Sequence, residues 1–279
     1  MKKLETMTAE QLQSAPYSPV PFLVDELLPE GLHILAGAPK IGKSWLALWL
    51  CLCVSQGQPL WNFAVTQGEV LYLSLEDSYR RIQSRLFDLT EDAPPTLHFA
   101  IMADILKHGL EQQIEQFLTE HPTTKLVVID TLQRVRSACS DSNLYANDYQ
   151  DVGLLKQLAD KHHIAVLLIH HLRKLHDDDP MNMISGSTGL SGAADSAFVL
   201  QKNARSANAA SLHCTGRDIP DRTLKLELGE DDHVWKLLSD SKTCTAAAKI
   251  SALQLVHLFS VLLSADPTYT GTPSALSAK

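Results

Sequence analysis

The sequence predicts an α/β fold in which a mostly parallel central sheet is flanked by helices and followed by a C-terminal β-meander. From Gly31 onward, short uninterrupted apolar segments typical of buried parallel strands alternate with helical patterns. After Ala193, four strand-like segments follow one another without helices between them, which is typical of a meander at the edge of a sheet. The chain has 279 residues, of which 45% are hydrophobic, enough for one sizeable core with short appendages.

The expected elements follow from these patterns in chain order. Strands are predicted at 32–36, 70–75, 97–102, 126–129 and 165–169, and helices at 43–55, 78–89, 110–119 and 151–162. The meander strands are predicted at 196–201, 210–215, 222–228 and 234–238, and a final amphipathic helix at 246–263. We therefore expect a proline-punctuated N-terminal arm (1–30), one α/β domain (31–240), and a C-terminal helix with a flexible tail (241–279).

Charge and cysteine usage exclude several classes of protein. With 32 acidic and 24 basic residues the net charge is −8, so any contact with nucleic acid has to be local. Five cysteines without a CxxC pair argue against a disulfide framework or a zinc ribbon. The start of the chain lacks an apolar signal segment, and the longest apolar run, 45–54, is too short to span a bilayer. A cytoplasmic protein without a membrane segment is expected.

A glycine-rich turn after the first strand has the pattern G-x-x-x-x-G-K-[ST]. In such a phosphate-binding loop (P-loop), backbone amides and a helix N-terminus surround the phosphates, the lysine neutralises their oxygens, and the hydroxyl reaches Mg²⁺. A strand before Gly37 and a helix after Ser44 provide the expected context, so a chance match is disfavoured. The predicted nucleotide-binding residues are Gly37, Ala38, Pro39, Lys40, Ile41, Gly42, Lys43, Ser44 and Trp45.

Asp130 is the predicted partner of the P-loop for magnesium. It follows four consecutive apolar residues, 126–129, and therefore lies at the carboxyl end of an interior strand, where open α/β sheets bind ligands. The predicted metal site is Mg²⁺ held by Ser44 and, through water, by Asp130. The alternative is that Asp130 caps a helix or belongs to a turn.

Hydrolysis needs a group that polarises the attacking water. Glu76 ends the strand predicted at 70–75, which we expect beside the P-loop strand, so this carboxylate is the predicted base. Asp77 competes for the role, but it is also a natural N-cap for the next helix, and capping is its predicted function. The alternative is that both carboxylates only cap and solubilise.

Two histidines, His170 and His171, end the strand predicted at 165–169. Successive side chains on a strand point to opposite faces, so only one of them can face the nucleotide. That histidine can sense the γ-phosphate. A surface pair or a zinc site is the alternative, although no third and fourth zinc ligand lie at a convincing spacing.

In combination, the segments GAPKIGKS, YLSLEDS, LVVIDT and LLIHHLRK resemble the RecA-like P-loop ATPases of the RepA-type and replicative hexameric helicase group, over about residues 20–240. The resemblance implies a RecA-like ATPase with ATP and Mg²⁺ as cofactors, assembled as a homo-oligomer, commonly a hexamer, that moves along single-stranded DNA. It implies that Lys43, Glu76 and Asp130 serve catalysis, with His171 as the γ-phosphate sensor.

The resemblance also implies an arginine donated across the subunit interface from the late meander. Arg217 is the candidate, with Lys202 and Arg205 as runners-up; a turn arginine paired with Asp218 or Asp221 is the alternative. The sequence departs from the family by carrying Phe198 where an arginine could follow Asp195 by three positions.

Two long polar loops, 132–147 and 172–192, follow the catalytic strands and are expected to face DNA. They begin with Arg134 and Arg136 and with Arg173 and Lys174, cations that could line a channel in a ring. The predicted function is a ring-forming DNA helicase or translocase that serves replication of a mobile element. Alternatives are an ATP-dependent loader or regulatory switch without unwinding activity, and a small-molecule kinase, which the hydrolytic base Glu76 disfavours.

Overall fold

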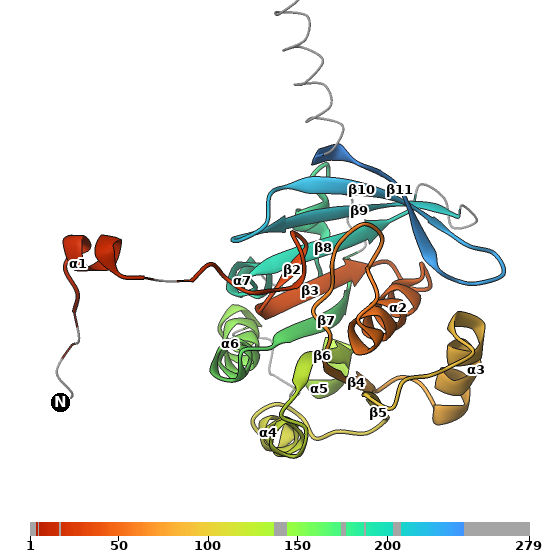
Figure 1. Cartoon of the computed structure of the whole chain (residues 1–279), viewed down its shortest axis with the longest axis horizontal. Helices are drawn as coiled ribbons and strands as arrows, with labels where there is room; N and C mark the ends of the chain where they lie inside the picture. The colour runs from red at the N-terminus through yellow and green to blue at the C-terminus, as the bar shows by residue number, and fades with distance from the viewer. Residues whose placement is uncertain are drawn as a thin grey trace, which may run out of the picture.

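The computed structural model describes Leu4 and residues 6–16, 18–136, 144–173, 177–186, 188–202 and 208–242. These parts form a nine-stranded sheet in the order β11-β10-β9-β8-β3-β7-β6-β4-β5 (Figure 1). The first strands of the sheet are β3 (Gly31–Gly37), β4 (Glu69–Ser74), β5 (Leu97–Ala100), β6 (Thr124–Asp130) and β7 (Ala165–His171). They are followed by β8 (Ser196–Gln201), β9 (Ala209–Gly216), β10 (Arg222–Leu228) and β11 (Trp235–Asp240).

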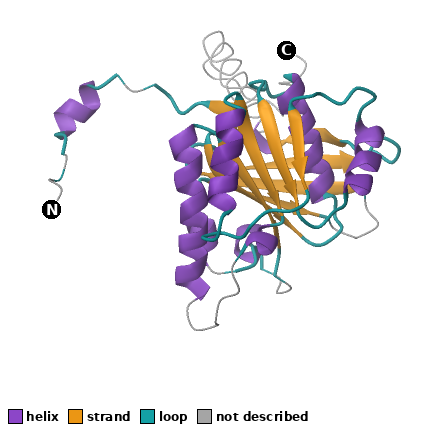
Figure 2. Ribbon diagram, turned by 90° about the horizontal axis from the view of Figure 1, so that it is seen from below, coloured by secondary structure: helices purple, strands orange, loops and turns teal. Residues whose placement is uncertain are grey.

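Helices cover both faces of the sheet because its parallel strands are apolar on both sides (Figure 2). One face packs against α2 (Lys43–Gln56), and the other against α4 (Leu110–Glu120), α5 (Leu132–Val135), α6 (Leu144–His162) and α7 (Thr188–Ala193). The helix α3 (Tyr79–Leu89) buries only Ile82 and lies at the β4–β5 end of the sheet. No helix in the described segments is long and apolar enough to cross a membrane.

The strands from β8 to β11 form the predicted meander. β8 is parallel to β3, with His33 opposite Ser196 and Gly37 opposite Leu200, and each later strand is antiparallel to the one before it. The alternating burial of β9 and β10 shows that one side chain in two faces the core there. Phe198 is 5% exposed and belongs to that core, which accounts for an apolar residue at this position.

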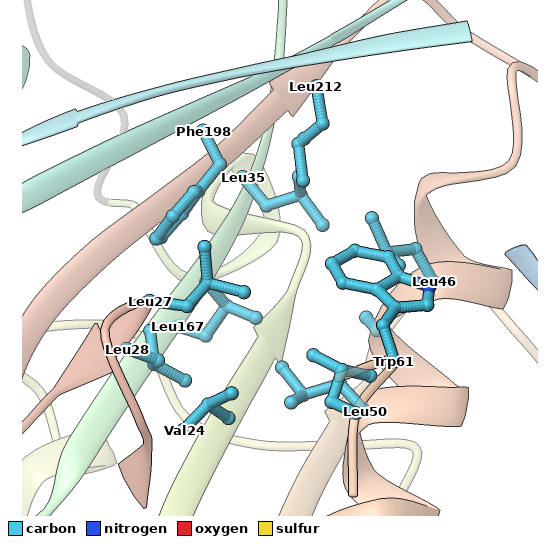
Figure 3. Close-up of a pocket in the computed structure, with 12 residues that line it drawn as sticks. Val24, Leu27, Leu28, Leu35, Leu46, Leu50, Trp61, Leu167, Phe198 and Leu212 are labelled. Carbon is cyan, nitrogen blue, oxygen red and sulfur yellow. The ribbon is translucent and has the colours of Figure 1, made fainter. Parts of the chain in front are cut away.

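The structure differs from the expected N-terminal arm over its last residues. The short hairpin of β1 (Phe22–Val24) and β2 (Leu28–Pro29) inserts Val24, Leu27 and Leu28 into the core on the α2 face. Figure 3 shows these three side chains around a small apolar cavity together with Leu46 and Trp61. The prolines of this segment predicted an irregular arm, but burial of its apolar residues holds the hairpin against the core. The described residues before β1, including α1 (Ala9–Ser14), project from the sheet as expected of an arm.

The first polar loop is shorter than expected. It was predicted over 132–147, but α5 occupies its beginning and α6 starts at Leu144 rather than at 151. The second loop contains a 3₁₀ helix, η2 (Pro180–Met183), and α7. The helix predicted at 246–263 and most of the expected tail lie outside the described residues.

Candidate nucleotide-binding site

Four parallel strands end at one edge of the sheet and bring the predicted site residues together. Gly37 lies opposite His171, and Asp130 lies opposite both Ser74 and Ile169. The P-loop, Asp130, His171 and the turn after β4 therefore share the edge at which open α/β sheets bind ligands.

The P-loop wraps around its own lysine. The Lys43 amine donates hydrogen bonds to the carbonyl oxygens of Gly37 at 2.8 Å and Ala38 at 3.0 Å. Burial lowers the pKa of Lys43 to about 8, while the charges of Asp130 and Glu76 act in the opposite direction. The tip of the loop, 38–40, is exposed to solvent. The Lys43 amine is thus held against the backbone of the P-loop.

Two glycines of the P-loop are required by close contacts. A Cβ on Gly37 would lie 2.9 Å from the carbonyl oxygen of Leu200, a backbone atom that cannot move aside easily. Gly42 has a φ of +101°, and a Cβ there would lie 2.9 Å from the ring of Trp235. The pattern of the motif is therefore accounted for by the backbone path and by the strands β8 and β11 that pack against it.

Asp130 lies beside the start of α2, as the magnesium role requires. It is 6% exposed and accepts hydrogen bonds from Ser44 and, at 2.8 Å, from the hydroxyl of Tyr72. Burial raises the pKa of Asp130, and these hydrogen bonds oppose the shift. Burial and Asp130 raise the pKa of Tyr72, which stays a hydrogen-bond donor. A hydroxyl and a carboxylate so placed fit Mg²⁺, which prefers oxygen ligands.

Tyr72 was not predicted as a site residue. It lies two residues before Ser74 on the face of β4 that also carries Val70, so its hydroxyl reaches Asp130 on the neighbouring strand. The alternation of side chains along β4 indicates that Tyr72 and Ser74 point to the same face. That Tyr72 reaches Asp130 could be predicted only with the pairing of β4 and β6 known.

Glu76 reaches the site by a different route from the one expected. β4 is not beside the P-loop strand, since β7 and β6 lie between β3 and β4. Glu76 is exposed in the turn after β4, and its carboxylate accepts a hydrogen bond of 3.1 Å from the Thr131 hydroxyl. The carboxylate therefore faces the end of β6, next to Asp130, and its charge acts on Lys43.

The predicted capping role of Asp77 is wrong. The N-cap of α3 is Ser78, whose side chain accepts from the Arg81 amide. The carboxylate of Asp77 instead binds Arg81 at 2.5 Å and Arg85 at 2.6 Å. Asp and Ser are both good N-caps, so the choice between neighbours was decided by these two arginines.

The two histidines at the end of β7 point to opposite faces, as predicted. His170 is 3% exposed, and its Nε2 lies 2.9 Å from the carbonyl oxygen of Ser185; burial lowers its pKa to about 4. His171 follows Ile169 on the α2 face and is half-buried beside the P-loop strand. His171 is therefore the histidine on the same side of the sheet as the P-loop helix α2.

Aromatic side chains border the P-loop. Trp45 stacks on His233 with ring centroids 4.3 Å apart, and the Arg85 guanidinium lies 5.5 Å from the Trp45 centroid. The buried indole of Trp235 donates to the Gly42 carbonyl at 3.1 Å, and Lys202 lies 5.2 Å from its ring centroid. The contributions of β11 were not predicted, because no local pattern relates residue 235 to residue 42.

The candidates for the arginine donated across a subunit interface, Arg217 and its runner-up Lys202, lie at opposite ends of the meander strands. Arg217 is 61% exposed and contacts Asp195 at 3.4 Å and the Gly192 carbonyl at 3.2 Å. Because Ser196 and Gly216 pair near the start of β3, Arg217 lies at the sheet edge opposite its own P-loop. Its acidic partner is Asp195, and not Asp218 or Asp221 as in the alternative of a turn arginine. Arg205 lies outside the described residues.

The loop cations differ in their exposure. Arg134 is exposed, whereas the Arg136 side chain is 13% exposed and lies 3.8 Å from the buried carboxylate of Asp151. Arg173 is 42% exposed and lies 3.8 Å from Asp177, and Lys174 is outside the described residues. Arg134 and Arg173 are thus more accessible to a ligand than Arg136.

Comparison with known proteins agrees with this geometry. A family model described as AAA domain matches residues 2–177. One solved structure, an isolated ATPase domain, superposes with a TM-score of 0.62 at 18% identity, covering 75% of this chain and 85% of that one. A DnaB-like replicative helicase, solved in a study of its interactions with primase, gives the same TM-score and identity. The match covers 75% of this chain and 58% of that helicase, so it spans less than two thirds of it. No curated protein matches the sequence. The predicted RecA-like fold is confirmed.

Proposed function

The chain belongs to the AAA domain family, and on that basis we propose that it binds ATP with Mg²⁺ at the P-loop and hydrolyses it to ADP and phosphate. The observation that carries the proposal is the convergence of Lys43, Ser44, Asp130 and Glu76 at one edge of the sheet. A cradle of backbone amides beside a buried amine and two carboxylates is the arrangement that phosphoryl transfer to water requires.

Each of these residues has a separate task. Lys43 would exchange its two loop carbonyls for phosphate oxygens, and Ser44 and Asp130 would hold Mg²⁺, which neutralises charge on the phosphates. Tyr72 donates to one oxygen of Asp130 and would hold this carboxylate in place for a metal-bound water. Glu76 is positioned by Thr131 to accept a proton from the attacking water. His171 would sense the γ-phosphate from the end of β7.

We further propose that hydrolysis drives movement along single-stranded DNA in a homo-oligomeric ring, with a hexamer as the expected form. Likeness of fold to the ATPase domain of a replicative helicase supports this proposal. The exposed arginines Arg134 and Arg173 follow the strands that carry Asp130 and His171, so they could couple phosphate release to DNA contact. A cytoplasmic role in replication of a mobile element is part of the same proposal.

The rate of ATP hydrolysis with and without single-stranded DNA tests the motor. We expect DNA to stimulate hydrolysis several-fold at low salt, and less at moderate salt because phosphate contacts are screened. Arg134→Ala should reduce the stimulation and leave the DNA-free rate unchanged. If DNA did not alter the rate of hydrolysis at either salt concentration, the proposal of a DNA motor would be wrong, and the proposal of an ATPase would stand.

The ring predicts that Arg217 completes the site of a neighbouring subunit, since it lies far from its own P-loop. Lys43→Ala and Arg217→Ala should each be inactive alone. Mixing them should restore up to roughly a quarter of the activity, because some sites then combine an intact lysine with an intact neighbouring arginine. The measurement is the ATPase rate of equimolar mixtures after reassembly. If mass measurements verified oligomers of mixed composition and no activity were recovered, Arg217 would not be the arginine that completes the neighbouring site.

A loader or regulatory switch is the alternative function, favoured by the net charge of −8 and by the pairing of Arg136 with Asp151. Unwinding of a forked duplex separates the two. DNA-stimulated hydrolysis together with strand separation indicates a helicase, whereas hydrolysis without strand separation indicates the switch.

A further inference from the structure

We propose that Glu69, His98 and His121 form a binding site for one divalent transition-metal ion, Zn²⁺ foremost, remote from the nucleotide. Glu69 is the first residue of β4, His98 lies in β5, and His121 is the C-cap of α4, three positions before β6 begins. Figure 1 shows β4, β5 and α4 grouped at the same end of the sheet. Ser74, which ends β4 and lies opposite Asp130, is five positions after Glu69, about 17 Å along the strand. The cluster therefore lies at the opposite edge of the sheet from Asp130.

The three ligand atoms are already close. One nitrogen of each imidazole and one carboxylate oxygen lie within 4.8 Å of one another. Nδ1 of His121 is 2.9 Å and Nε2 of His98 is 4.0 Å from the same oxygen of Glu69. Tetrahedral zinc with bonds of about 2.0–2.2 Å separates its ligand atoms by roughly 3.4 Å. The two observed distances lie on either side of this value, so small side-chain rotations would bring all three atoms into the coordination sphere.

Hydrogen bonding within the protein leaves part of this cluster unsatisfied. His121 and Glu69 form one hydrogen bond, but Nε2 of His98 is buried and has no hydrogen-bond partner among the described residues. Buried polar atoms are normally satisfied, and a metal ion would satisfy this nitrogen. An ordinary hydrogen-bonded cluster explains His121 but not His98.

Packing holds both imidazole rings toward the carboxylate. Phe117 stacks on His121 at 4.3 Å between centroids and meets His98 edge to face at 5.2 Å. The backbone carbonyl of His121 accepts from the Thr124 hydroxyl at 2.7 Å, and the Glu69 amide donates to Thr123 at 3.1 Å. The ligands are thus fixed by an aromatic ring and by their own backbones before any ion arrives.

The donor set selects the ion. Two imidazoles and one carboxylate favour Zn²⁺ and its neighbours in the transition series, whereas Mg²⁺ prefers oxygen ligands alone. Three protein ligands leave room for a water as the fourth. An ion here would join the amino ends of β4 and of the edge strand β5 to the end of α4, and would stabilise the folded state by binding to it alone.

The test uses the full chain, freed of metal and kept in excess Mg²⁺ to occupy the carboxylates of the nucleotide site. Co²⁺ is titrated while visible absorption is recorded, and Zn²⁺ affinity and thermal unfolding are then measured. We expect one Co²⁺ per chain with the intense absorption of low-coordinate cobalt, and an increase in Tm of about 5 °C with saturating Zn²⁺.

His98→Gln and Glu69→Gln should each weaken Zn²⁺ affinity at least about tenfold. His108→Gln, which changes an exposed histidine outside the cluster, should not. Circular dichroism checks that each variant is folded. The cobalt spectrum of the unaltered chain tests the site independently of the variants. A six-coordinate cobalt spectrum, no binding of Zn²⁺ at micromolar concentrations, or equal affinity in His98→Gln and His108→Gln would each overturn the proposal. ATP hydrolysis is not among the readouts, so failure of the proposed function leaves this test unaffected.

Discussion

Lys43→Ala is expected to reduce ATP hydrolysis by about 100-fold or more, because it removes the positive charge on which the γ-phosphate depends. The amine lies buried within the P-loop, where it donates to the carbonyls of Gly37 and Ala38. The measurements are equilibrium binding of ATP and steady-state release of phosphate. Lys161→Ala, which removes an exposed lysine on α6, is the matched control and should retain full activity.

Loss of activity in Lys43→Ala should not reflect loss of fold. Burying the amine is unfavourable, which offsets the two hydrogen bonds it makes, so we expect Tm to change by no more than about 3 °C. If the variant hydrolysed ATP at the normal rate, the assignment of the P-loop as the catalytic site would be wrong.

The pH dependence of binding gives this lysine a signature of its own. Burial lowers the pKa of Lys43 to about 8 in the free protein, so the amine is charged below pH 8 and increasingly neutral above it. Phosphate oxygens favour the charged form and raise the pKa again. ATP affinity should therefore fall as the pH rises through 8, with proton uptake on binding, and Lys43→Ala should lose both effects.

Glu76→Gln should preserve ATP binding and reduce turnover by about 10²–10⁴-fold, the usual contribution of a general base. The amide oxygen of glutamine can still accept the hydrogen bond from Thr131, so the geometry of the turn is retained while proton acceptance is lost. Single-turnover phosphate release, measured at saturating ATP, separates this step from binding.

The neighbouring carboxylate supplies the comparison for Glu76. Asp77 is occupied by Arg81 and Arg85, so Asp77→Asn should loosen α3 and leave hydrolysis within a few-fold of normal. If Asp77→Asn abolished turnover and Glu76→Gln did not, the base would be Asp77.

The long strands and the P-loop were predictable because their signals are local. Four apolar residues before Asp130 and the fixed spacing from Gly37 to Ser44 are properties of short segments, and the structure places both where expected. Alternation along β7 also separated His170 from His171 correctly, because side-chain direction on a strand has a period of two.

The remaining features depend on contacts between distant segments. The position of β4 away from β3 is set by crossover connections, so the expectation that Glu76 follows a strand beside the P-loop was wrong although the residue still faces Asp130. The hairpin β1–β2 is too short and too rich in proline to be recognised locally, and its burial comes from the α2 face. Tyr72 and Trp235 likewise act on residues that only strand pairing brings near them.

The contact between Trp235 and the P-loop has a consequence for folding during synthesis. Its ring packs on Gly42 and its N–H holds the carbonyl of that glycine, yet 193 positions separate the two in the chain. Domains emerge from the ribosome with their N-terminal elements first. A nascent chain that ends at β10 carries the whole phosphate-binding motif without the aromatic surface that supports it. The P-loop therefore gains its contact with Trp235 only after β11 has been translated.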